Sequence, residues 1–183
     1  NGCYFMDDLT GVVVGGNQSM DSIQTIIRTT DGGDNWSVIS DNLGNWLRAV
    51  HFQDANNGIA VGDRGTILKT TDGGQNWTNL SANSGVSSRQ LNDVFMIDAN
   101  NAIAVGGWPD NDSIQTIIRT TDGGATWGIV RDNVASMLNA VFFKSNIEGY
   151  AVGDDGTLLI TIDQGASWQS LVIPNNDVVG LQD

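Results

Sequence analysis

The sequence is short of cysteine and of long apolar runs. Cys3 is the single cysteine among 183 residues, so no intrachain disulfide can form. Because Cys3 falls within an expected strand, we expect its thiol to be buried and structural. No run of eighteen apolar residues occurs, which excludes a transmembrane helix and predicts that the chain does not insert into a membrane.

Basic residues are scarce as well. The 8 Lys and Arg residues stand against 21 Asp and Glu residues, a formal net charge of −13. Such a surface repels phosphate backbones and anionic lipids, so nucleic acid is not an expected partner. The acidity fits a soluble exported protein, and it leaves open an acidic site for cations or basic partners. The sequence has no Cys/His metal set, no phosphate-cradling loop and no Ser–His–Asp arrangement, so we expect no metal and no cofactor.

Glycine is abundant, with 23 residues against 2 prolines, a balance typical of tight turns between short strands. One motif, Thr-x-Asp-x-Gly-x-x-Trp, occurs four times, first over residues 29–36. Its aspartates are separated by 41, 50 and 41 residues, and segment 21–33 recurs letter for letter at 112–124. A unit of two repeats, 91 residues long, therefore occurs twice.

Every repeat contains the same four short runs of apolar and β-branched residues. We name them strands A, B, C and D, which in the second repeat cover residues 49–52, 58–62, 66–70 and 77–80. Four short strands in such a period predict an all-β propeller of four-stranded antiparallel blades. We expect blades near residues 1–42, 43–84, 85–134 and 135–176.

The ends of the sequence predict a larger ring. Residues 2–7 align with residues 93–98, so the chain begins inside strand A of blade 1, and residues 177–183 look like the start of a further strand A. Four blades are the lower limit of the usual range, and an open stack leaves apolar blade faces uncovered. We expect the missing blades to come from the rest of the polypeptide or from a second copy.

The repeated motif lies between strands C and D, where it predicts a tight hairpin. Its aspartate can accept hydrogen bonds from backbone N–H groups nearby, its second glycine supplies a positive φ, and its tryptophan packs between sheets. One carboxylate per turn is too few for Ca²⁺. We therefore assign a structural role to Asp31, Gly33, Trp36, Asp72, Gly74, Trp77, Asp122, Gly124, Trp127, Asp163, Gly165 and Trp168.

This motif resembles the Asp-box, or BNR repeat, and residues 60–74 are especially similar to Ycf48-like repeats. The resemblance covers essentially the whole chain and implies a propeller with Asp-box C–D hairpins. Ycf48-like repeats occur in photosystem II assembly factors and in many exported bacterial proteins. Asp-boxes also occur in sialidases, xyloglucanases and non-enzymatic propellers, so the resemblance implies the fold and leaves the function open.

The two faces of such a propeller differ in loop length. The A–B and C–D turns lie on one face, which we call the box face, and the B–C and D–A connections lie on the other, which we call the loop face. Blades 1 and 3 have B–C connections six residues longer than that of blade 2. Long loops on a rigid scaffold commonly carry binding sites. Our candidate ligand-binding residues are therefore Trp108, Asp110, Asn111, Asp112, Asn17, Gln18 and Asp21.

No catalytic set is expected on the loop face. Resemblance to sialidases would imply an arginine triad, a Tyr–Glu pair and an acidic Asp, but Glu148 is the single Glu and lies in an A–B turn. Arg28 and Arg119 directly precede boxes, again at the box face, and His51 lies in strand A, where we expect it to face a neighbouring strand. A glycosidase using two Asp residues stays open.

We therefore expect a non-enzymatic binding or scaffold module of a secreted, cell-surface or periplasmic protein, with a protein or glycan ligand. One alternative is a fragment of an Asp-box glycoside hydrolase of the sialidase or xyloglucanase kind. The other alternative is an assembly factor for a membrane complex, which the Ycf48-like resemblance implies.

Overall fold

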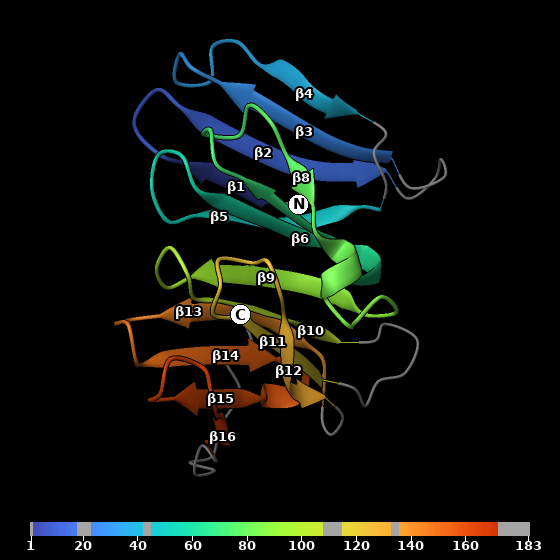
Figure 1. Cartoon of the computed structure of the whole chain (residues 1–183), viewed down its shortest axis with the longest axis vertical. Coiled ribbons are helices and arrows are strands. Elements are labelled where there is room, and N and C mark those ends of the chain that lie inside the picture. The colour runs from blue at the N-terminus through green and yellow to red at the C-terminus, as the bar shows by residue number, and fades with distance from the viewer. Residues whose placement is uncertain (1, 18–22, 42–44, 108–114, 133–135, 172–183) are drawn as a thin grey trace, which may run out of the picture.

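The computed structural model describes residues 2–17, 23–41, 45–107, 115–132 and 136–171. Within them, sixteen strands form four separate antiparallel sheets of four strands each (Figure 1). In this part of the chain, helix is confined to three short 3₁₀ turns, Asp63–Gly65, Ser81–Asn83 and Asp154–Gly156. The expectation of an all-β chain of four propeller blades is confirmed.

Each sheet is an up-and-down meander in which strands A to D pair in chain order. Blade 1 contains β1 (Gly2–Phe5), β2 (Gly11–Asn17), β3 (Ile23–Thr29) and β4 (Ser37–Asp41). Blade 2 contains β5 (Leu47–Phe52), β6 (Gly58–Gly62), β7 (Ile67–Thr70) and β8 (Thr78–Asn79). Blade 3 contains β9 (Gln90–Met96), β10 (Ala102–Gly107), β11 (Gln115–Thr120) and β12 (Gly128–Asp132). Blade 4 contains β13 (Leu138–Phe143), β14 (Gly149–Gly153), β15 (Leu158–Thr161) and β16 (Gln169–Ser170). The exact blade boundaries, and the strand expected over residues 177–183, stay predictions because they fall partly or wholly outside the described residues.

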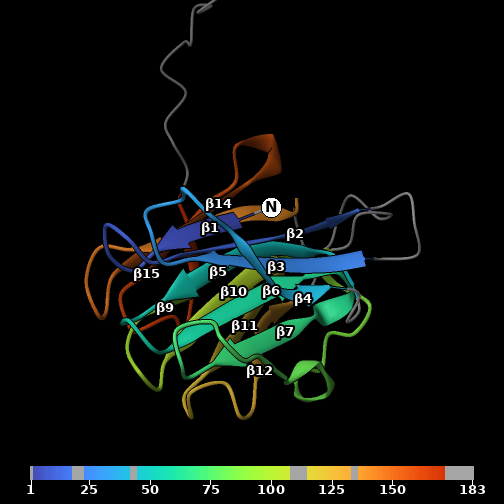
Figure 2. The ribbon, with the colours of Figure 1, turned by 90° about the horizontal axis from the view of Figure 1, so that it is seen from above.

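The blades stack in chain order, with blade 1 and blade 4 at opposite ends of the view in Figure 1 (see also Figure 2). The A strands of neighbouring blades contact one another, β1 with β5, β5 with β9 and β9 with β13. In the described part of the chain, no comparable strand contact joins blade 1 to blade 4. The four blades therefore form an open segment of a propeller.

Three apolar cores lie between the four blades. Each core takes side chains from strands A to D of both neighbours, as when Val12 of blade 1 packs with Phe52 and Leu68 of blade 2. The second core joins blades 2 and 3 around Val61 and Trp127, and the third joins blades 3 and 4. Because every residue of the central strand β6 is buried, that strand contributes to the packing on both of its faces.

The expectation of a buried thiol at Cys3 is wrong. Cys3 is exposed, whereas the equivalent inner-strand residues Val50, Val94 and Val141 are at most 7% exposed. Those valines face the preceding blade, and blade 1 has no preceding blade in this chain. The strand prediction was right, and the burial prediction failed because burial here depends on a neighbouring sheet.

No described helix is long and apolar enough to cross a membrane.

Candidate functional site

The box face repeats one hydrogen-bond pattern four times. In the third box, Thr120 Oγ1 donates to Asp122 Oδ1 (2.8 Å), Gly124 N donates to Thr120 Oγ1 (2.9 Å), and Thr126 N donates to Asp122 Oδ1 (2.9 Å). The same three bonds, within 0.1 Å of these lengths, recur in the other boxes. Each aspartate thus forms its hydrogen bonds within its own hairpin, so the boxes stabilise the turns.

The tryptophans and the ionised carboxyl groups of the boxes also have structural roles. Trp36, Trp77 and Trp168 donate their indole N–H to the carbonyl oxygen of the second box glycine over 3.0–3.2 Å. Hydrogen bonds from neighbouring residues lower the pKa of Asp31 and of Asp122 to about 2, first of all bonds from Asn35 and Thr126 respectively. These carboxyl groups therefore stay ionised and bonded across the physiological pH range.

Cationic side chains in strand C tie the second, third and fourth boxes to the blade before each of them. Arg28 Nε donates to Gly73 O (2.8 Å), Lys69 Nζ donates to Gly123 O (2.6 Å), and Arg119 Nε donates to Gln164 O (3.0 Å). These three cations occupy equivalent positions in the sequence repeats, and the structure shows what each of them bonds to. Their partners are backbone carbonyls of the next blade, so they are clamps between blades.

Glu148 also lies at the box end of its blade, as its A–B turn predicted. Tyr150 Oη donates to Glu148 Oε1 (2.6 Å), and Lys144 Nζ pairs with the same oxygen (2.7 Å). The bond to the carboxylate raises the pKa of the Tyr150 hydroxyl, while Lys144 and Tyr150 lower the pKa of Glu148. Tyr150, Glu148 and Lys144 thus form one polar cluster at the box end of blade 4.

The residues that the sequence singled out on the loop face lie almost wholly outside the described residues. These are Trp108, Asp110, Asn111, Asp112, Gln18 and Asp21. Asn17 is the last residue of β2, which places its backbone at the loop-face end of blade 1. Their role in binding stays a prediction, and the described part of the loop face adds residues that the sequence analysis missed.

A β-bulge interrupts strand A at the same place in three blades. The pairing register shifts at Arg48 in blade 2, at Asn92 in blade 3 and at Asn139 in blade 4. A bulged residue is left out of the strand ladder, and bulges commonly redirect side chains next to functional sites. Three polar side chains are thereby placed at equivalent positions along the loop-face end of the inner strands.

The three bulged side chains use different partners. Arg48 Nε pairs with Asp63 Oδ1 (2.5 Å), and its guanidinium lies 4.7 Å from the centre of the Trp46 ring. Asn139 Nδ2 donates to Asp154 Oδ1 (2.7 Å), and Asp154 is the equivalent of Asp63 in the 91-residue repeat. Blades 2 and 4 therefore share one arrangement, a bulged donor bonded to the first residue of a short B–C turn.

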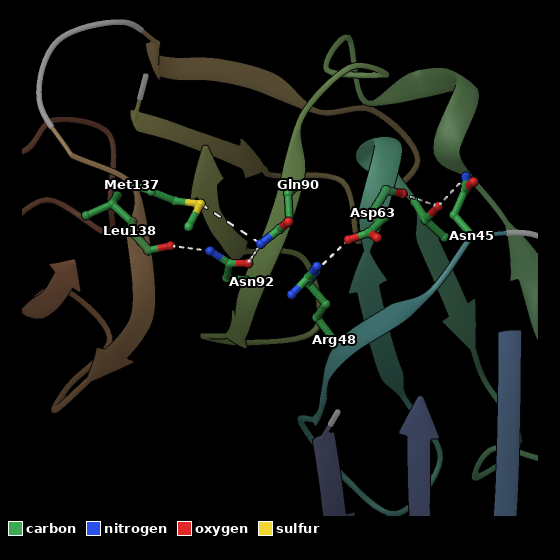
Figure 3. Close-up of polar contacts among 8 residues, drawn as sticks. Asn45, Arg48, Asp63, Gln90, Asn92, Met137 and Leu138 are labelled. Carbon is green, nitrogen blue, oxygen red and sulfur yellow. Dashed lines mark hydrogen bonds and ion pairs between the residues drawn. The ribbon is translucent and has the colours of Figure 1, made fainter. Parts of the chain in front are cut away.

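Blade 3 differs in the partners of its bulged residue, and its B–C connection lies outside the described residues. Asn92 Nδ2 instead donates to Leu138 O of blade 4 (2.7 Å), and Gln90 Nε2 donates to Asn92 Oδ1 (2.5 Å). Figure 3 shows this chain of amide contacts bridging the two blades, beside the Arg48–Asp63 pair. Alternating amide donors and acceptors of this kind can also pair with a peptide backbone.

The short B–C turns expose strained charged residues. Arg64 and Asp155 occupy equivalent positions in blades 2 and 4 and have φ values of 54° and 53°, in the left-handed region that favours glycine. Both side chains are exposed. Ser136 Oγ donates to Asp155 Oδ2 (2.5 Å), which helps to hold the blade 4 turn. Residues in such strained conformations cluster at functional sites, and a third one, Gln164, lies in the fourth box.

One carboxyl group with a raised pKa lies behind this face. Burial raises the pKa of Asp93, whose two oxygens accept the backbone N–H groups of Val94 and Val141 over 2.9 Å. Because both oxygens are engaged and Val141 belongs to blade 4, Asp93 ties blade 4 to blade 3. Within the described residues, no three His, Cys, Asp or Glu side chains gather closely enough to hold a metal ion.

The bulged residues have a signal in the sequence that was overlooked. The segments Leu47-Arg48-Ala49-Val50, Leu91-Asn92-Asp93-Val94 and Leu138-Asn139-Ala140-Val141 share the pattern Leu-polar-x-Val. Strict strand alternation would put this leucine and this valine on opposite faces, yet both pack in the same core, the one shared with the preceding blade. A polar residue inside such a pattern therefore marks a bulge.

The model of the family described as photosynthesis system II assembly factor YCF48 matches residues 3–84 and 34–107, which together cover more than half of the chain. The chain belongs to this family. The resemblance to Ycf48-like repeats is thereby confirmed.

Solved structures support the propeller fold. A structure described as YCF48 bound to D1 peptide is 18% identical, with a TM-score of 0.57, over 93% of this chain and 81% of that one. YCF48 from Cyanidioschyzon merolae is 25% identical, with a TM-score of 0.53, over 69% of this chain and 39% of that one. An ancestral GH74 enzyme is 17% identical, with a TM-score of 0.67, over 94% of this chain and 26% of that one.

The chain thus spans about a quarter to four fifths of these structures. No curated protein matches it.

Proposed function

We propose that this chain is a non-enzymatic propeller module that binds an extended protein segment on its loop face. The observation that carries the proposal is the bulge repeated at Arg48, Asn92 and Asn139. It places polar side chains side by side on three neighbouring inner strands, which is the arrangement needed to follow an extended chain. The loops predicted to carry Trp108 and Asp112 border the same face.

The chemistry of the described residues suits a peptide. Gln90, Asn92 and Asn139 present amide groups, which can donate to peptide carbonyls and accept from peptide N–H groups. Arg64 adds an exposed positive charge to a chain that is otherwise strongly acidic, so acidic groups of a ligand would be drawn to blade 2. A family member in complex with the D1 peptide supports a peptide ligand as the class to test first.

The described carboxylates give little support to hydrolysis. Asp63 pairs with Arg48, Asp154 accepts from Asn139, and Asp155 accepts from Ser136. A glycosidase needs one carboxylic acid with a raised pKa opposite a second carboxylate. Asp93 has the raised pKa, but both of its oxygens accept backbone N–H groups, so it is not placed to protonate a substrate.

A role as an assembly factor is the second candidate, and family membership favours it. The two candidates overlap, because an assembly factor would also work by binding a protein segment. A secreted, cell-surface or periplasmic location is part of the same proposal and is supported by the net charge of −13.

The experiment is a binding assay with the D1 peptide of the family complex and, in parallel, a displayed library of random peptides selected on the 183-residue chain. We expect enriched peptides whose dissociation constants, measured by calorimetry, rise at least about tenfold for Asn139→Ala. Asn76→Ala on the box face is the matched control and should leave the affinity unchanged. Failure to enrich any peptide, or equal affinity for Asn139→Ala, would overturn the proposal.

A hydrolase assay tests the enzyme reading separately. We expect no turnover of xyloglucan or of a fluorogenic sialoside. Sialoside turnover that is abolished by Glu148→Gln would show that the chain is an enzyme, and turnover that survives this substitution would place the catalytic site elsewhere.

A further inference from the structure

The box face carries a groove at two of its blade junctions. One groove lies between the first and second boxes and has a volume of about 440 Å³, and the other lies between the second and third boxes and has a volume of about 330 Å³. Sites for small ligands typically have volumes of roughly 300–1,000 Å³. Each groove is walled by two neighbouring blades of the chain, and we name them groove 1–2 and groove 2–3 after those blades.

The two grooves are lined by residues at the same positions of the repeat. Both have a cation of strand C, the threonine before the box aspartate, that aspartate, and one hydroxyl and one aliphatic side chain of strand D. In groove 1–2 these are Arg28, Thr30, Asp31, Ser37 and Ile39. In groove 2–3 they are Lys69, Thr71, Asp72, Thr78 and Leu80. One set of chemical groups is therefore presented twice, one blade apart.

The cation of each groove keeps hydrogen-bond donors for a ligand. Arg28 Nε donates to Gly73 O (2.8 Å), and its two terminal nitrogens have no hydrogen-bond partner among the described residues. Lys69 Nζ donates to Gly123 O (2.6 Å), which uses one of the three N–H groups of its ammonium. Each cation therefore contacts the next blade and still has N–H groups that can reach a bound molecule.

The grooves also present acceptors and hydroxyl groups. Asp31 Oδ2 accepts one hydrogen bond, from Asn35 Nδ2 (2.8 Å), and Asp72 Oδ2 likewise accepts one (2.7 Å). Each of these oxygens has a second lone pair that can accept from a ligand. Thr30 and Thr71 are exposed, and their hydroxyl groups bond to no other residue in the described part of the chain. A ligand in either groove therefore meets donors and acceptors side by side.

A buried indole beside groove 2–3 lacks a partner as well. Trp127 Nε1 is buried without a hydrogen-bond partner, whereas the other three box tryptophans donate to a glycine carbonyl. A Cβ placed on Gly124 would lie 3.8 Å from both Trp127 Nε1 and Leu80 Cδ1. The indole nitrogen is thus close to the aliphatic wall of the groove. A buried donor without a partner is costly, and a ligand that accepts its hydrogen bond would remove that cost.

We propose that these two grooves bind neutral sugars, with one sugar unit in each groove. Each groove holds one carboxylate and one cation, so its charges balance, and the net charge of −13 of the whole chain repels anionic polysaccharides. A sugar ring has hydroxyl groups that donate and accept, and an apolar ring face that fits against Ile39 or Leu80. Equal grooves at successive blades suit a ligand made of repeating units, unlike the peptide proposed for the loop face.

The junction of blades 3 and 4 provides a comparison within the molecule. Gly128 stands where the other two junctions have the hydroxyl side chain of strand D. Arg119 donates through Nε to Gln164 O (3.0 Å) and also through Nη2 to Asn101 Oδ1 (3.1 Å). This junction therefore has one hydroxyl group fewer and a cation with fewer free donors, and we expect it to bind no sugar.

The first test is an NMR titration of the isotope-labelled 183-residue chain with cellohexaose, maltohexaose and mannohexaose, and with a hyaluronan oligosaccharide as the anionic comparison. We expect at least one neutral oligosaccharide to shift the amide signals of Thr71, Thr78 and Gly123 and of their counterparts in groove 1–2. The indole N–H signal of Trp127 should shift more than those of the other box tryptophans, and hyaluronan should shift none of these signals. No shift with any neutral oligosaccharide, or shifts confined to the loop face, would overturn the proposal.

Two variants that fill the grooves test the location of the sites. Thr78→Trp should abolish the shifts of groove 2–3 and keep those of groove 1–2, and Ser37→Trp should do the opposite. Both residues are exposed, so the variants should fold, which circular dichroism checks. A folded Thr78→Trp chain that keeps the shifts of groove 2–3 would show that the sugar binds elsewhere.

A smaller substitution tests the hydroxyl group itself. Thr71→Val keeps the shape of the side chain and should raise the dissociation constant of groove 2–3 about two- to tenfold, because one hydrogen bond is lost. Thr121→Val is the matched control, since Thr121 holds the same position at the junction of blades 3 and 4, and it should leave the affinity unchanged. Equal affinities of the two variants would contradict the proposed role of the groove. The peptide assay on the loop face is independent of this result.

Discussion

The box face repeats the same three hydrogen bonds in four blades, whereas the bulged position on the loop face bonds to a carboxylate in blades 2 and 4 and to the next blade in blade 3. Each box aspartate accepts a near-identical hydrogen bond within its own hairpin, as seen at Asp31, Asp72, Asp122 and Asp163. On the loop face, Arg48 uses a carboxylate and an aromatic ring, while Asn92 crosses to the next blade. Uniform contacts serve the scaffold, and varied contacts on the same backbone positions are what recognition of a non-repeating ligand requires.

The largest expected effect concerns a buried box tryptophan. Trp168→Ala should lower the free energy of unfolding by ~3–5 kcal/mol, because Trp168 is 8% exposed and packs edge-on against Phe143. Denaturant unfolding followed by circular dichroism measures the loss. Trp36→Ala is the control in the same motif of blade 1, where the side chain is 37% exposed, and its loss of stability should be clearly smaller. Equal losses at both positions would show that burial in a core between blades does not determine how much a box tryptophan stabilises the fold.

The second effect is a pH dependence that originates in a blade contact. Burial lowers the pKa of His51 from 6.5 to about 4, and His51 Nδ1 accepts the N–H of Met96 in the next blade (3.3 Å). The folded state therefore binds a proton less readily than the unfolded state. Stability due to neutral His51 should be full above pH ~6.5 and be lost as the pH falls toward ~4, by roughly 3 kcal/mol.

The variant for this prediction is His51→Phe, because blades 3 and 4 have Phe95 and Phe142 at the same position. We expect the variant to remove the slope of stability between these two pH values when unfolding is measured at several pH values. The box aspartates affect stability at lower pH. Because the pKa values of Asp31 and Asp122 are about 2, their contribution to stability is lost as the pH falls below 3.8. A slope unchanged in His51→Phe would assign the pH dependence to other groups.

A smaller effect is expected at the clamps between blades. Arg119→Met should cost about 1–2 kcal/mol, because it removes the bonds to Gln164 O and to Asn101 Oδ1 while keeping the apolar stem. Arg64→Met removes an exposed cation from a loop-face turn and is the matched control, with an expected change below ~0.5 kcal/mol. The midpoint of thermal unfolding compares the two. A larger loss for Arg64→Met would mean that the clamps contribute nothing specific.

The blades and the boxes could be predicted from the sequence because both depend on local residue patterns. A hairpin with Asp, Gly and Trp at fixed spacing is specified within about ten residues, and its fourfold repetition left little room for another fold. The bulges at Arg48, Asn92 and Asn139 depend on how strand A pairs with strand B, and the targets of Arg28, Lys69 and Arg119 depend on what the next blade presents. Cys3 was predicted wrongly for the same reason, since its burial needs a neighbouring blade. Contacts between blades are not encoded by spacing alone.

The most direct measurement of the central claim is a paired one, affinity for a selected peptide and free energy of unfolding on the same variants. Asn139 is exposed, so Asn139→Ala should change stability by less than ~0.5 kcal/mol while weakening peptide binding about tenfold or more. Asp122→Ala on the box face should do the reverse, lowering stability by removing three hydrogen bonds of its hairpin and leaving the affinity of the folded fraction unchanged. The contrary result is that Asn139→Ala binds like the unmodified chain, whereas Asp122→Ala stays folded and loses binding. The peptide would then bind to the box face, and the roles proposed for the two faces would be wrong.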